Sequence, residues 1–177
     1  MAAICVFCGS RTGERERYAR TADDVGRLLA ERGVDLVYGG GSIGLMGRCA
    51  DAALAAGGNV IGVIPTLLHQ VEIAHAGITS MEVVDGMMPR KERMMELSDG
   101  FVCLPGGYGT FDELLEVVTW AQLRLHEKPI GILDTDGFYQ PFLALVDHLV
   151  AEGFVNAENR ELMIVRDDPA ALLDAVL

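Results

Sequence analysis

The chain has 177 residues, half of them apolar, and its 26 acidic and 14 basic side chains give a formal net charge of −12. This length fits one domain with a real core, so we treat residues 1–177 as a single unit. The acidic balance argues against a general role on nucleic acids or membrane surfaces, because both are polyanionic. A small anionic molecule stays compatible with it, since backbone donors and a few arginines can bind an anion locally.

No segment contains about 18 uninterrupted apolar residues, so no membrane span is expected. The first residues carry no basic charge and lead directly into a strand, so no signal peptide is expected either. Cys5 and Cys8 have an odd separation, which directs their side chains to opposite faces of an extended strand and disfavours a zinc or redox pair. With Cys49 and Cys103 they are predicted to be buried free thiols in a reducing cytoplasm.

Strand-like and helical patterns alternate along the chain. The expected strands are Ile4–Cys8, Asp35–Tyr38, Val60–Ile64, Ser80–Val84, Gly100–Leu104, Pro129–Leu133 and Leu162–Val165. The expected helices are Glu14–Arg32, Leu45–Ala56, Met87–Leu97, Phe111–Leu125, Tyr139–Glu152 and Ala170–Val176. Regular alternation with short connections predicts a Rossmann-like, doubly wound α/β fold of about seven mainly parallel strands with helices on both faces.

Three glycine-bearing turns follow expected strands. They are Cys8–Ser10, Gly39–Gly47 and Pro105–Thr110. One such turn is explained by a tight connection, but three at the C-terminal ends of strands indicate a ligand site. Glycine N–H groups and a helix N-terminus together favour a phosphate. Neither the dinucleotide fingerprint nor the Walker loop fits any of these turns.

The expected helix Phe111–Leu125 carries two carboxylates, Glu113 and Glu116, on one face with Trp120. The rest of its circumference is largely apolar, so we expect burial on nearly all sides and packing against another subunit. Carboxylates on such a helix need partners. The alternative is that both glutamates only stabilise the N-terminal turns through the helix dipole.

On the expected helix Met87–Leu97, Arg90 and Lys91 project within the apolar stripe formed by methionines and a leucine. An unpaired cation in that position costs several kcal/mol to bury. The two cations therefore either extend to the edge of the stripe, or meet an anion. That anion is the ligand phosphate or the carboxylates of the next helix.

Together these elements resemble the Lonely Guy (LOG) family, the cytokinin riboside 5′-monophosphate phosphoribohydrolases once mislabelled lysine decarboxylases. The matching segments are Gly39–Gly47 (GGGSIGLMG), Arg90-Lys91, Pro105–Glu113 with Glu116 (PGGxGTxxE), Thr119–Leu123, Lys128-Pro129 and Gly153-Phe154. The resemblance covers essentially the whole chain. One departure is Met88-Pro89, where relatives often carry a histidine and a residue other than proline.

The resemblance implies hydrolysis of the N-glycosidic bond of an adenine-type nucleoside 5′-monophosphate, with no metal or organic cofactor, by a homo-oligomer, most simply a dimer. It assigns catalysis to Arg90, Glu113 and Glu116. The residues expected to contact the substrate or its phosphate are Gly9, Ser10, Gly40, Gly41, Met87, Lys91, Gly106, Gly107, Gly109 and Thr110.

Two alternatives stay open, a general AMP or nucleoside 5′-monophosphate hydrolase and a non-catalytic nucleotide sensor. Lysine decarboxylation is disfavoured, because that reaction commonly uses pyridoxal phosphate on a Schiff-base lysine. The chain offers only Lys91 and Lys128, and neither stands in a recognisable cofactor context.

Overall fold

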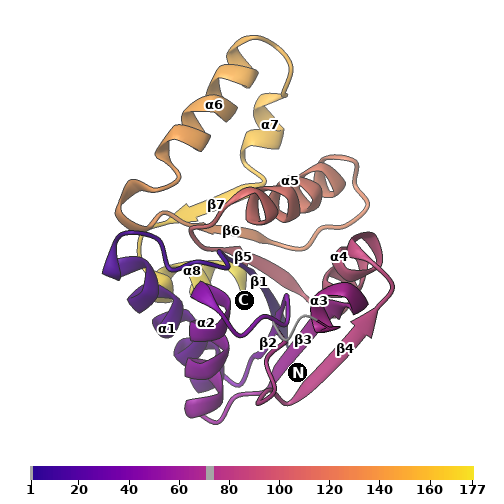
Figure 1. Ribbon diagram of the computed structural model, residues 1–177. Coiled ribbons are helices and arrows are strands. Elements are labelled where there is room, and N and C mark those ends of the chain that lie inside the picture. The colour runs from indigo at the N-terminus through magenta and orange to yellow at the C-terminus, as the bar shows by residue number, and fades with distance from the viewer. Residues whose placement is uncertain (1, 71–73) are drawn as a thin grey trace.

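The computed structural model describes residues 2–70 and 74–177, which form one seven-stranded parallel sheet in the order β4-β3-β2-β1-β5-β6-β7 (Figure 1). The strands are β1 (Ala3–Phe7), β2 (Asp35–Tyr38), β3 (Val60–Pro65), β4 (Ser80–Val84), β5 (Gly100–Cys103), β6 (Ile130–Leu133) and β7 (Met163–Arg166). The helices are α1 (Glu16–Glu31), α2 (Gly44–Ala55), α3 (Thr66–Gln70), α4 (Met87–Glu96), α5 (Tyr108–Gln122), α6 (Gln140–Ala151), α7 (Ala157–Arg160) and α8 (Pro169–Val176), with a 3₁₀ turn η1 (Thr135–Gly137).

The predicted α/β fold is confirmed, with all seven expected strands and all six expected helices present. The prediction missed α3, α7 and η1, each of five residues or fewer and too short to show a helical period. Helix α5 begins at Tyr108 rather than at Phe111, so Gly109 and Thr110 belong to its first turn and not to the preceding loop.

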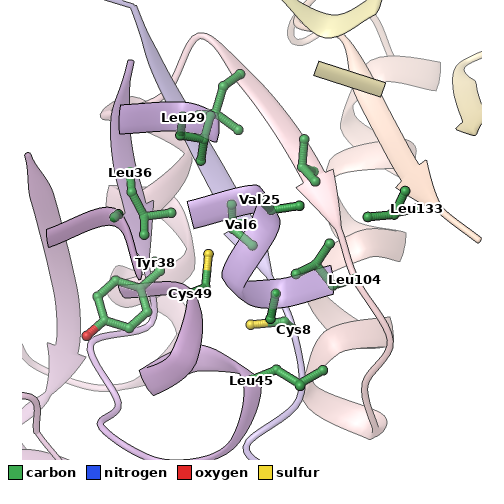
Figure 2. Close-up of a cluster of buried hydrophobic side chains, with 14 of the residues drawn as sticks. Val6, Cys8, Val25, Leu29, Leu36, Tyr38, Leu45, Cys49, Leu104 and Leu133 are labelled. Carbon is green, nitrogen blue, oxygen red and sulfur yellow. The ribbon is translucent and has the colours of Figure 1, made fainter. Parts of the chain in front are cut away.

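The strands alternate between two buried layers. On β1, Ile4, Val6 and the following Cys8 face one layer, in which α1, α2 and α8 pack on the sheet (Figure 2). Ala3, Cys5 and Phe7 face the other layer, which includes side chains of α4, α5 and α6. Cys5 and Cys8 therefore lie on opposite faces, as predicted, and all four cysteines are free and buried.

The chain reverses its direction of winding at β1, which pairs with β2 on one side and with β5 on the other. In open parallel sheets, ligands bind in the crevice outside the carboxyl ends of the strands at such a point. The loops after β1 and β5 meet there, because the Gly9 N–H donates to the Pro105 carbonyl at 3.1 Å. The Leu45 N–H donates to the Gly9 carbonyl at 2.9 Å, so the fold brings all three predicted glycine turns into contact.

Helix α5 is not buried on nearly all sides in this chain, contrary to the sequence-based expectation. Of its apolar residues Leu114 and Val117 are fully buried, whereas Leu115 is 47% exposed. Leu123 and Leu125, directly after the helix, are 59% and 64% exposed. The sheet and α4 cover one side of α5, and α6 and α7 stand out beyond the β7 edge (Figure 1). Among the described residues, no helix is long and apolar enough to cross a membrane.

Candidate active site

Helix α4 carries Arg90 into the interior, where the side chain is 9% exposed. Its Nε donates to the Val63 carbonyl of β3 at 3.0 Å, and Nη2 donates to the Gly39 carbonyl after β2 at 3.3 Å. Its Nη1 lies 3.1 Å from Oε1 of Glu113 on α5. Three fixed acceptors hold the guanidinium in one orientation, and this stiffness suits an electrostatic role.

Gly39 is a glycine because Arg90 occupies the space beside it. A Cβ on Gly39 would lie 1.9 Å from Nη2 of Arg90, far inside van der Waals contact. The first glycine of the Gly39–Gly47 run therefore serves the catalytic candidate rather than a phosphate. The sequence showed the glycine but not this reason, because the two residues are 51 positions apart in the chain.

The carboxyl of Glu113 is 11% exposed and titrates abnormally. Burial raises its pKa from the ordinary 4.5 to about 7, because desolvation outweighs the attraction of Arg90. The neighbouring Asp112 adds to the rise, and Lys91 opposes it. A carboxyl that titrates near neutral pH is suited to general acid–base work.

Lys91 enters the same layer and meets two more carboxylates of α5. Its Nζ lies 3.1 Å from Oδ2 of Asp112 and 3.1 Å from Oε2 of Glu116. Although burial lowers the pKa of Lys91, the two carboxylates beside its ammonium produce a net rise. The sequence left two possible partners for Arg90 and Lys91, the ligand phosphate and the carboxylates of the next helix. In the structure both cations contact the carboxylates. Asp112 was not among the predicted site residues, and its only signal was its place inside the PGGxGTxxE motif.

The first turn of α5 is open for a ligand. No side chain caps its N-terminus within the described residues, so its first N–H groups have no partner in the helix. A Cβ on Gly107 or Gly109 would meet nothing within 4 Å, whereas one on Gly106 would lie 2.0 Å from the Thr110 hydroxyl. Gly106 thus makes room for buried Thr110, and Gly107 and Gly109 leave the backbone accessible.

A crevice of about 470 Å³ lies beside this turn. Its lining includes the predicted Gly9, Ser10, Gly106 and Gly107. Three further lining residues, Leu45, Pro105 and Tyr108, belong to the predicted glycine turns. The sequence analysis missed Arg11, Thr12, Gly13, Tyr18 and Phe138. The rings of Tyr18 and Phe138 meet edge to face at 5.7 Å. The polar backbone of the glycine turns and these aromatic rings together make a mixed pocket of the kind that binds small molecules.

The remaining predicted residues lie elsewhere around the strand ends. The Gly40 carbonyl accepts from the His75 N–H at 2.9 Å, and Gly41 forms a bridge with Ala74. Met87 is 47% exposed at the start of α4. The space between Lys91, Glu113 and Glu116 is too tight for a water molecule. Five of the charged side chains on α4 and α5 thus lie together in one cluster: Arg90, Lys91, Asp112, Glu113 and Glu116.

Residues 46–176 match the protein family described as "Possible lysine decarboxylase". The chain is 50% identical over 161 residues to the rice cytokinin riboside 5′-monophosphate phosphoribohydrolase LOG, an alignment that takes in 91% of this chain and 66% of that protein. It is 48% identical over 91% of its length to the Arabidopsis thaliana enzyme LOG3, of which it spans 75%. This chain belongs to the LOG family. Within the family signature, Arg90 and Glu113 are the pair that the fold brings into contact.

Solved structures share the architecture of this LOG-family chain at low sequence identity. The molybdenum cofactor carrier protein of Chlamydomonas reinhardtii superimposes with a TM-score of 0.75 at 24% identity, over 99% of this chain and 95% of that one. The molybdenum cofactor binding protein of Rippkaea orientalis gives 0.74 at 20% identity, over 99% and 94% of the two chains. At this identity the likeness establishes the fold alone.

Proposed function

We propose that this LOG-family chain hydrolyses the N-glycosidic bond of cytokinin riboside 5′-monophosphates, releasing the free base and ribose 5-phosphate. The main support is the buried Arg90–Glu113 pair. The carboxyl of Glu113, which ends the PGGxGTxxE motif, has a pKa of about 7. Relatives at 48–50% identity are named for this reaction.

Glu113 is the residue that acts on the reacting centre. As the bond to the base breaks, its electron pair leaves with the base nitrogen and the anomeric carbon gains oxocarbenium character. The ionised carboxylate stabilises that positive charge and accepts a proton from the water whose oxygen adds to the carbon. The departing base takes up one proton in exchange, so the two halves of the water molecule end on the sugar and on the base. Arg90 holds the carboxylate at 3.1 Å and fixes its direction. Glu116 is the second carboxylate of the reaction, one helical turn along α5.

The phosphate of the substrate binds at the open N-terminus of α5, where Gly107 and Gly109 leave the backbone N–H groups free to reach it. The loop of Gly9 and Ser10 completes the cradle, since Gly9 touches Pro105 at 3.1 Å. The five clustered residues carry two positive and three negative charges when all are ionised, so the cluster repels the phosphate and favours its binding at the backbone instead.

The enzyme works as a homodimer. The exposed leucines around α5, 47–64% accessible in one chain, form an apolar face of the kind that a second copy covers. The four free thiols fit a cytoplasmic location, where disulfides are rare. Schiff-base chemistry is disfavoured further, because Lys91 holds two carboxylates and Lys128 Nζ donates to the Met95 carbonyl at 2.6 Å.

Chromatography of reactions with isopentenyladenosine monophosphate and with AMP tests the proposal. We expect free base and ribose 5-phosphate from the cytokinin nucleotide, with a higher kcat/KM than for AMP. A higher kcat/KM for AMP would make the chain a general nucleotide hydrolase. Intact nucleotides in the presence of measurable binding would make it a sensor and contradict the proposal.

A further inference from the structure

Lys91, the second cation of the cluster, contacts Asp112, a residue with no role in the proposed reaction so far. Lys91 bridges Asp112 and Glu116, which are four residues apart on α5, at 3.1 Å to each. Residues with this spacing lie on the same face of a helix. One ammonium therefore ties two consecutive turns of α5 together, and it does so directly beside Glu113.

Three carboxylates, those of Asp112, Glu113 and Glu116, lie near the ammonium of Lys91. Its side chain is 9% exposed, so it needs an anionic partner within reach. Glu113 is close enough for the charge of Lys91 to lower its pKa, and a lysine stem is flexible. The contact with Asp112 restrains the ammonium at a point where it also lies 3.1 Å from Glu116. The position of Lys91 is therefore set jointly by Glu116, which is 16% exposed, and by Asp112, which is 58% exposed.

We propose that Asp112 is a positioning residue for the hydrolysis: it anchors the Lys91 ammonium so that Lys91 serves Glu116 and leaves Glu113 to Arg90 alone. This inference rests on the proposed function, because it assigns Glu113 to the reacting centre. Asp112 itself does not touch the substrate.

The charge balance of the cluster gives the inference a measurable consequence. Two cations face three carboxylates, so one proton makes the cluster neutral, and Glu113 is the carboxyl whose pKa is raised. Removing the charge of Asp112 removes one of the causes of that rise and frees Lys91 to approach Glu113. Both changes favour the ionised form of Glu113.

The other charged and titratable groups near Glu113 do not reverse the expected fall in its pKa. From α4 they are Arg90 and Lys91, and from α5 Asp112. The thiols of Cys5 and Cys103 lie in the same layer as Glu113, and that of Cys8 lies on the opposite face of the sheet. Burial raises the pKa of all three thiols. These thiols stay neutral near pH 7, so they do not titrate in the range in which Glu113 does.

The experiment compares Asp112→Asn with Asp112→Glu and with a matched control, Asp147→Asn. Asp147 is 60% exposed and pairs with Arg160 at 2.6 Å, so it has the same residue type, a similar exposure and an ion pair, but it lies on α6. The measurements are kcat and KM for isopentenyladenosine monophosphate from pH 5 to pH 9, and the thermal midpoint of each variant.

We expect Asp112→Asn to lower kcat about tenfold with KM unchanged, as for a misplaced catalytic group, and to move the acid limb of the pH profile toward lower pH. Asp112→Glu restores most of the activity, and Asp147→Asn behaves as the wild type. Unchanged kcat and pH profile in Asp112→Asn would overturn the inference. So would a loss of kcat with an unmoved acid limb and a lower thermal midpoint, which is the signature of a merely structural ion pair.

Failure of the proposed function is distinguishable from failure of this inference. If the wild type shows no turnover, the proposed function fails, and the pKa of Glu113 is then followed by NMR of carboxyl-labelled glutamate. A lower pKa of Glu113 in Asp112→Asn than in the wild type supports the electrostatic coupling of Asp112 and Lys91 to Glu113. An equal pKa in the two proteins overturns it.

Discussion

The two faces of the sheet bury different kinds of side chain, although the same strands supply both. The layer under α1, α2 and α8 is built chiefly from aliphatic side chains and thiols (Figure 2). The layer between the sheet and α4 and α5 is also apolar, but it takes in Arg90 and Lys91, 7% and 8% exposed, with their carboxylates. Burying an ion pair contributes little to stability, because desolvation offsets the attraction. The layer under α1, α2 and α8 therefore contributes mainly to stability. The layer under α4 and α5 contains buried charges that add little stability and are suited to catalysis.

Glu113→Gln is expected to have the largest effect on kcat of all the variants, and it tests the charged layer of α4 and α5. The amide keeps an oxygen for Arg90 but cannot ionise, so kcat falls by about two orders of magnitude or more while nucleotide binding persists. Steady-state kinetics and calorimetric titration with the nucleotide check this. A variant with near-normal kcat would show that Glu113 is not the group that acts on the reacting centre.

Gly39→Ala is expected to come next. The new Cβ would lie 1.9 Å from Nη2 of Arg90, so the guanidinium has to leave its place beside Glu113. We expect kcat to fall about tenfold to a hundredfold, as for a misplaced catalytic group. Gly57→Ala is the control, because Gly57 has open space around it, although its φ of +79° makes that change slightly destabilising. Normal kcat in a folded Gly39→Ala protein would contradict the role of Arg90.

The pH dependence of stability sharpens the comparison. The pKa of Glu113 is raised from 4.5 to about 7 in the folded chain, so between these values the folded state holds a proton that the unfolded state has released. The free energy of unfolding therefore falls as pH rises through this window. Denaturant titrations of wild type and Glu113→Gln should differ in that change by roughly 1–3 kcal/mol. Parallel curves for the two proteins would mean that Glu113 titrates normally.

Ile4→Val is expected to have the smallest effect and tests the apolar face. Ile4 is 1% exposed in the layer under α1 and α2, and losing one methyl group there costs about 0.5–1.5 kcal/mol of unfolding free energy. The kcat of the folded protein stays unchanged, because the deletion lies across the sheet from the charged cluster. Chemical denaturation and steady-state kinetics on the same preparation measure both. A fall in kcat would show that the two faces are not independent.

Prediction from the sequence succeeded where the signal is local. Strand and helix positions follow from residue periodicity, and the opposite faces of Cys5 and Cys8 follow from the alternation along β1. It failed for α3 and α7, which are too short for a period, and for the burial of α5. The composition of a helix tells how much apolar surface it has, but not how much of that surface its own chain covers.

The sequence by itself determined the α/β fold, the family signature and the presence of two cations within an apolar stripe. Only the tertiary structure decided how those cations are shared, with Arg90 on Glu113 and Lys91 between Asp112 and Glu116. It also decided that Gly39 makes room for a guanidinium. These pairings join segments up to 51 residues apart, and they depend on how α4 and α5 settle against the sheet. Such distances are set by the packing of the whole core and leave no trace in local patterns.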